Sequence, residues 1–86
     1  MYNGYKNRET WNVALWLQND NTLYTIASAF MKRNTTRSPY RDFIFYVKRG
    51  IALPDRTPDG VNWLSHKLSY RELNEVMRGF YDPTLS

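Results

Sequence analysis

The 86-residue chain contains no cysteine, so its fold must be stabilised by a packed core without disulfide bridges. A chain of this length buries only about 60–65% of the surface that its unfolded form exposes, so the core has to be efficient. Three tryptophans, seven tyrosines and four phenylalanines make such a core feasible, because each aromatic side chain buries roughly 150–250 Å². The length leaves room for one domain, spanning residues 1–86.

The missing residue types also exclude several kinds of site. Without cysteine there is no thiolate chemistry and no cysteine-based zinc site, and the single histidine, His66, cannot build a multi-histidine metal site. No apolar run approaches the roughly 20 residues of a membrane span, and no signal-peptide pattern opens the chain. We therefore expect a soluble, cytoplasmic protein without metal, cofactor or membrane contact.

Polar residues mark both ends of the first predicted helix. Asn7 is a favourable N-cap, Glu9 places a carboxylate in the first turn, and the polar cluster 19–21 ends the apolar run. The apolar residues between them nearly encircle the helix axis, which predicts burial on more than one side. We accordingly expect Trp11 and Leu15 in the core.

A second helix is predicted after Asn21 by apolar spacing alone. Its apolar residues follow the pattern i, i+3, i+4, i+7, i+8: Leu23, Ile26, Ala27, Phe30 and Met31. Phe30 is expected in the core, and two basic residues fall in the last turn, where cations suit the helix dipole. The short polar link to the first helix predicts an antiparallel helical hairpin.

The third helix opens at Ser38-Pro39, with serine as N-cap and proline at the first helical position. Its apolar residues then repeat at helical spacing: Tyr40, Phe43, Ile44, Val47 and Ile51. The run 43–47 also suits a strand, because it is aromatic and β-branched. The capping signal, and the lack of a partner strand elsewhere, favour a helix. Gly50 is expected to end it in a left-handed conformation.

A connector over residues 52–60 leads to the last helix. It ends in Thr57-Pro58-Asp59-Gly60, which fits a type I turn, although Thr-Pro equally suits the cap of a short helix containing Trp63. Ser69 and Glu72 then form a capping box, in which each side chain bonds the backbone N–H of the other.

The apolar face of the last helix repeats at helical spacing, and the helix is expected to end near Gly79, before Asp82-Pro83. Its members are Tyr70, Leu73, Val76, Met77 and Phe80. Together the segments predict an all-α fold, a compact single-domain bundle of four to five short helices, with Ile44, Trp63 and Leu73 in the core. An N-terminal arm, residues 1–6, precedes the bundle. Its Tyr2 and Tyr5 either fold back over Trp11 or form an adhesive extension.

The net charge of +4 is concentrated in the middle of the chain. Residues 32–56 hold seven cations and two anions, whereas the rest of the chain holds five cations and six anions. Six of these cations are candidate partner-binding residues: Lys32, Arg33, Arg37, Arg41, Lys48 and Arg49. A basic patch of this kind can bind an acidic protein or phosphate groups, or it can be only a solvated face of the protein.

Catalysis has no support in the sequence. His66 has no nucleophile or second base with which to act, and Glu72 and Glu75 are explained by capping and by a polar helix face. Nucleic-acid binding has some support in the sequence. Basic residues flank the polar link at residues 34–36, and Tyr40 and Tyr46 would stack on bases if exposed. The run 43–47, however, is too apolar to read bases.

The chain contains an ETWNVALW run at residues 9–16, with the residues before it, and an RTPDGVNW run at residues 56–63. Both runs resemble recurring stretches in a group of small uncharacterised proteins of bacteriophages and other mobile elements. The resemblance implies no site residues. It implies an accessory protein acting in the cytoplasm of a bacterial host, where we expect it to inhibit or redirect an acidic host protein or nucleoprotein complex, as anti-defence inhibitors do. A direct DNA- or RNA-binding regulator is the alternative, and the oligomeric state stays open.

Overall fold

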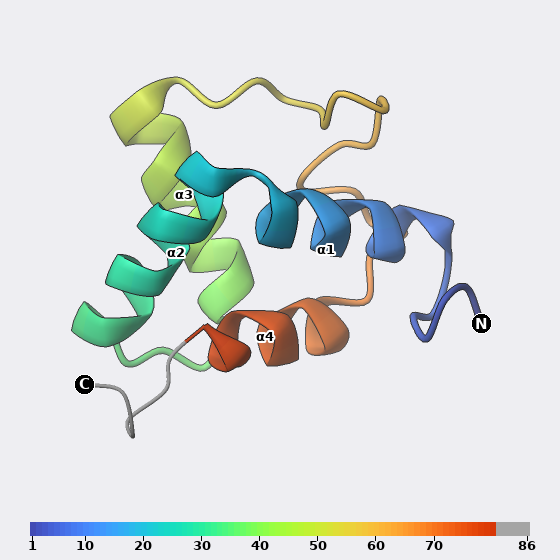
Figure 1. Ribbon diagram of the computed structural model, residues 1–86, viewed down its shortest axis with the longest axis horizontal. Coiled ribbons are helices and arrows are strands. Elements are labelled where there is room, and N and C mark those ends of the chain that lie inside the picture. The colour runs from blue at the N-terminus through green and yellow to red at the C-terminus, as the bar shows by residue number, and fades with distance from the viewer. Residues whose placement is uncertain (81–86) are drawn as a thin grey trace.

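Four α-helices make up most of the protein, whose computed structural model describes residues 1–80. They are α1 (Arg8–Asn19), α2 (Asn21–Arg33), α3 (Pro39–Ile51) and α4 (Tyr70–Gly79) (Figure 1). Residues 1–80 contain two isolated β-bridges and no sheet. The predicted all-α bundle is therefore confirmed, and the ambiguous run 43–47 is helical. The expected stop signal at Asp82-Pro83 lies outside the described residues.

Two of the helix N-termini are set by the predicted caps. The side-chain oxygen of Asn7 accepts a hydrogen bond from the backbone N–H of Thr10 at 2.9 Å, and Ser69 Oγ accepts one from the N–H of Glu72 at 3.3 Å. Each cap satisfies one of the N–H groups that a helix leaves free in its first turn. Ser38 makes no such bond, and α3 instead begins with the preset backbone of Pro39.

One residue, Asp20, joins α1 to α2. Its N–H donates to the carbonyl of Trp16 at 3.0 Å, and its Oδ1 accepts from the N–H of Leu23 at 3.0 Å, so it caps both helices. A single linking residue cannot reverse the chain, and α2 runs off at an angle to α1 instead of returning alongside it (Figure 1). The predicted antiparallel hairpin is therefore wrong.

The core is formed by all four helices together with the segment before α4. Phe30, Ile44, Trp63 and Leu73 are buried as predicted. The other large or medium apolar side chains of the core are Val13, Leu17, Leu23, Tyr40, Phe43, Val47, Val61, Leu68 and Met77.

Two expected core residues of α1, Trp11 and Leu15, are only partly buried. The side of α1 that faces inward carries polar as well as apolar residues, with Thr10 and Asn12 as buried as Val13. The Trp11 ring lies outside this stripe and packs on the ring of Tyr2, with 5.1 Å between ring centroids. Periodicity misled here because it treats only apolar residues as candidates for burial.

The N-terminal arm folds back as a small hairpin. Tyr2 and Tyr5 exchange two backbone hydrogen bonds, of 2.7 and 2.8 Å, around Asn3-Gly4, whose φ angles of +48° and +90° are both positive, as in type I′ turns. The Lys6 N–H donates to Oε1 of Glu72 at 2.8 Å. The Glu72 carboxylate therefore holds the arm, and the predicted second half of its capping box is wrong.

The end of α3 also differs from the prediction. Gly50 stays helical, and the left-handed residue is Ala52, with a φ of +51°. Ile51, which the spacing placed on the apolar face, is the last helical residue and is 49% exposed. The connector then turns at Thr57–Gly60, where the Gly60 N–H donates to the Thr57 carbonyl at 2.8 Å. The predicted turn is therefore present, and the alternative short helix containing Trp63 is not formed.

No helix within residues 1–80 has the length and apolar character needed to cross a membrane.

Candidate partner-binding surface

The six predicted basic residues fall into two groups at opposite ends of α3. Lys32 and Arg33 end α2, Arg37 lies in the link to α3, and Arg41 is in the first turn of α3. Lys48 and Arg49 lie in its last turn. Arg41 and Lys48 are seven helical residues apart, or about 10 Å along the helix axis. The structure therefore does not gather the six cations at one point.

The Lys48 charge is compensated within the protein. Its Nζ lies 2.8 Å from Oδ1 of Asp55 in the connector. The hydrogen bond and the positive charge of Lys48 lower the pKa of Asp55 below its usual value. This ion pair ties the connector to the end of α3, so Lys48 is better explained as a structural contact than as a binding residue.

A basic residue that the sequence prediction missed joins the first group. Arg78, in the last turn of α4, lines a shallow depression of about 270 Å³ together with Lys32. The link residues Asn34, Thr35 and Thr36 complete most of the wall, and no carboxylate of residues 1–80 is among the lining side chains. We call Lys32, Arg33, Arg37, Arg41 and Arg78 the basic surface. Spacing along the sequence offers no signal that α4 ends beside α2.

Arg41 is oriented by α4. Its guanidinium carbon lies 5.5 Å from the ring centroid of Tyr70, within the range of a cation–π interaction. The Tyr70 hydroxyl donates to the carbonyl of Ser65 at 3.0 Å. Partial burial raises the pKa of Tyr70, and the charge of Arg41 opposes that rise. The cation at position 41 is therefore held in place on the surface.

Only one of the two tyrosines proposed to stack on bases is available. Tyr40 is fully buried, and its hydroxyl donates to the carbonyl of Trp63. Burial, with a smaller contribution from Tyr70, raises the pKa of Tyr40 well above its usual value. Tyr46, by contrast, is 55% exposed.

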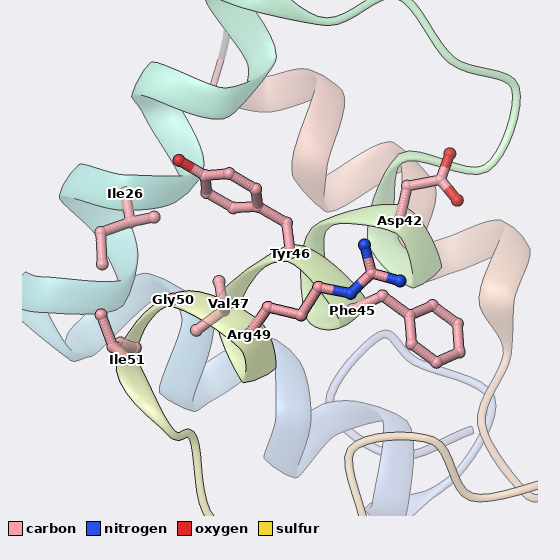
Figure 2. A pocket seen from close by; sticks show the side chains of 8 residues that line it. All are labelled: Ile26, Asp42, Phe45, Tyr46, Val47, Arg49, Gly50 and Ile51. Atoms are coloured by element: carbon pink, nitrogen blue, oxygen red, sulfur yellow. The ribbon is translucent and has the colours of Figure 1, made fainter.

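The outer face of α3 forms a groove of about 830 Å³ (Figure 2). Phe45 and Tyr46 stand on it with exposed fractions of 47% and 55%, and Arg49 extends between Phe45 and Asp42. Tyr46 leans towards α2, where its ring lies 5.4 Å from that of Phe30. These aromatic side chains are large apolar groups left open to solvent.

The two motif runs meet in the folded chain. Asn12, which is buried, donates from Nδ2 to Oδ2 of Asp59 at 2.7 Å, and its Oδ1 accepts from the Thr57 hydroxyl at 2.7 Å. Trp16 Nε1 donates to the same Asp59 oxygen at 2.9 Å. Hydrogen bonds from Asn12 and then Trp16 lower the pKa of Asp59. This hydrogen-bond network joins α1 to the connector, and its polar groups bond to one another.

His66 is exposed beside Lys67. Within residues 1–80, His, Asp and Glu side chains form no group of three or more that is placed to hold a metal ion.

Residues 1–82 match the model of DUF7249, a family of unknown function. The chain belongs to this family. Both motif runs lie within the matched residues. No curated protein and no solved structure matches the chain.

Proposed function

We propose that this protein works by binding rather than by catalysis, and that its basic surface binds an acidic protein partner. The observation that carries the proposal is the depression shared by Lys32 and Arg78. Two cations from different helices face one hollow, and no carboxylate of residues 1–80 lines it to compensate them. A carboxylate from a partner would supply that compensation, and fixed positive charge also speeds the encounter with an acidic surface.

An acidic protein fits this surface better than a nucleic acid does. Tyr40 is buried, and the apolar side chains Phe43, Ile44 and Val47 of α3 are in the core, so these four side chains are not available to contact bases. Arg41 is engaged with the ring of Tyr70. Phosphate contacts from the remaining cations are the alternative that the experiment below distinguishes.

The resemblance of the two motif runs to phage and mobile-element proteins gives the proposal a setting. In that setting the partner is a host protein or nucleoprotein complex in the bacterial cytoplasm. Occupation of its acidic surface would inhibit or redirect it, as in an anti-defence protein.

The test reverses charges of the basic surface and compares capture of partners from a bacterial lysate. Lys32→Glu, Arg37→Glu and Arg78→Glu are combined in one variant. The matched control combines Arg8→Glu, Lys67→Glu and Arg71→Glu, which are three exposed cations elsewhere with the same total charge change. Both variants should melt within a few degrees of the parent, because surface charges contribute little to stability.

We expect the parent and the control variant to capture the same protein with or without nuclease, and the first variant to lose it. Equal capture by both variants would overturn the proposal. Capture that disappears with nuclease, together with a steep loss of affinity for random duplex as salt rises, would assign the surface to nucleic acid instead.

A further inference from the structure

The outer face of α3 carries a short sequence of exposed side chains that is complementary to itself. Asp42, Phe45, Tyr46 and Arg49 occupy positions i, i+3, i+4 and i+7 of the helix, and all four are exposed. At 3.6 residues per turn, Asp42 and Arg49 lie within about 20° of one line along the helix, and the two rings lie about 50° to either side of it. In the sequence of the stripe Asp42 comes first and Arg49 last, with the two aromatic positions between them, and the Arg49 side chain extends back along the helix between Phe45 and Asp42 (Figure 2).

We propose that this face binds the same face of a second copy of the chain, with the two α3 helices antiparallel. The twofold axis passes between positions 45 and 46. In this register Asp42 lies opposite Arg49 of the second copy. Because a twofold interface uses the same patch on both subunits, this pair forms twice. Phe45 and Tyr46 lie on different flanks of the stripe, so each ring meets the same ring of the second copy beside the axis.

Burial of the two rings provides the main driving force. Phe45 and Tyr46 are 47% and 55% exposed in the single chain, and they border a groove large enough to accept side chains from outside. Aromatic residues dominate the energetics of protein interfaces. Here four rings, two from each copy, would leave water together.

Charge complementarity makes a second copy a better occupant of this face than an acidic protein. An acidic partner would meet Asp42, whose carboxylate is held on the surface by a hydrogen bond from the Thr36 hydroxyl. A second copy instead places that carboxylate against a base. Lys48 adds little repulsion between the copies, because Asp55 compensates it. Lys32, Arg33 and Arg78 lie outside the stripe, so this inference is independent of the proposed partner binding.

A charge-swap experiment tests the pairing by sedimentation equilibrium of the purified chain. Arg49→Asp places acids opposite acids, and Asp42→Arg places bases opposite bases, so each variant alone should be monomeric where the parent is dimeric. An equimolar mixture of the two variants should again form dimers, and so should the double variant D42R/R49D. Circular dichroism melting checks that each variant is folded.

A monomeric parent at all accessible concentrations would overturn the proposal, and so would a mixture that stays monomeric although both variants are folded. Because the chain has no cysteine, a second test needs no background correction. Tyr46→Cys should form a disulfide-linked dimer rapidly under mild oxidation, because position 46 lies beside the axis. Tyr24→Cys, at an α2 residue of similar exposure (46%), is the matched control and should stay monomeric. Equal cross-linking of the two variants would contradict the pairing.

Discussion

Asn12 and Asp59 are 47 positions apart in the sequence, and a hydrogen bond of 2.7 Å joins Nδ2 of the first to Oδ2 of the second. Asn12 is almost completely buried in the middle of α1, where an amide without partners would be costly. The connector supplies both of its partners, since Thr57 donates to the other side of the same amide. The packing of α1 thus depends on a turn that forms far along the chain.

Replacing Asn12 with alanine should therefore destabilise the fold out of proportion to the small volume removed. The variant loses two hydrogen bonds and leaves the buried Thr57 hydroxyl without its acceptor, so we expect the free energy of unfolding to fall by about 1–3 kcal/mol. Urea denaturation followed by circular dichroism measures this. Gln18→Ala, at an exposed position of the same helix, should be close to neutral. Equal effects of the two substitutions would contradict a structural role for the network.

The same network should give the protein an acid-sensitive stability. Because hydrogen bonds from Asn12 and Trp16 lower the pKa of Asp59 in the folded state, folding favours the ionised carboxylate. Its contribution is present above the unfolded pKa of about 3.9, and it is lost as the pH falls through the lower, folded value. Asp55, whose pKa Lys48 lowers, acts in the same direction.

Melting temperatures measured from neutral pH down to about pH 2 should therefore fall below about pH 4. Asp59→Asn should reduce that fall, because the variant has no charge to lose at this site. An unchanged acid dependence in this variant would show that Asp59 does not contribute to it.

The burial of the large side chains predicts unequal costs for two truncations. Phe30 is 8% exposed and packs edge-on against Phe43, so Phe30→Ala should cost about 3–5 kcal/mol. Trp11 is only partly buried and covered by the arm, so Trp11→Ala should cost clearly less. Chemical denaturation of both variants checks the order, and a reversed order would mean that the arm is part of the main core.

Two glycines should respond in opposite directions to substitution by alanine. Gly50→Ala should raise the free energy of unfolding of the monomer by about 0.5–1 kcal/mol, because the site is helical and open. Gly4→Ala should lower it, because the hairpin requires a φ of +90° at that position. Thermal melts at low protein concentration, where the monomer dominates, make the comparison. A stabilised Gly4→Ala variant would contradict the turn in the arm.

Local signals in the sequence predicted most of the helices. Asn7, Ser69 and the polar residues around Asp20 mark caps, and a cap depends only on atoms within one turn of the chain. Long-range partners were beyond this reasoning. Nothing near Glu72 indicates that its carboxylate binds the N–H of Lys6 rather than its own helix cap. The direction of α2 was also missed, because spacing gives the length of a link but not the angle between helices.

Only part of the candidate surface was predicted, because sequence patterns show which residues are close along the chain and not which are brought together by folding. A charge count along the sequence finds Lys32, Arg33, Arg37 and Arg41, because they are close together in the chain. It cannot find Arg78, which α4 brings beside Lys32, and it cannot see that Asp55 compensates Lys48. The apolar repeat of the third helix omits Phe45 and Tyr46, which agrees with the exposure of both side chains.

The double cap at Asp20 has a consequence for the length of the chain. A residue inserted in the link between α2 and α3 changes only a loop, whereas a residue inserted in the first turn of α2 would rotate the rest of that helix by about 100° relative to its cap at Asp20. That rotation would carry Leu23, Ala27 and Phe30 out of the core together. We therefore expect an insertion or deletion at the start of α2 to destabilise the fold. Asp20 fixes the rotational position of α2 about its own axis, as the pairing register fixes which face of a strand is buried.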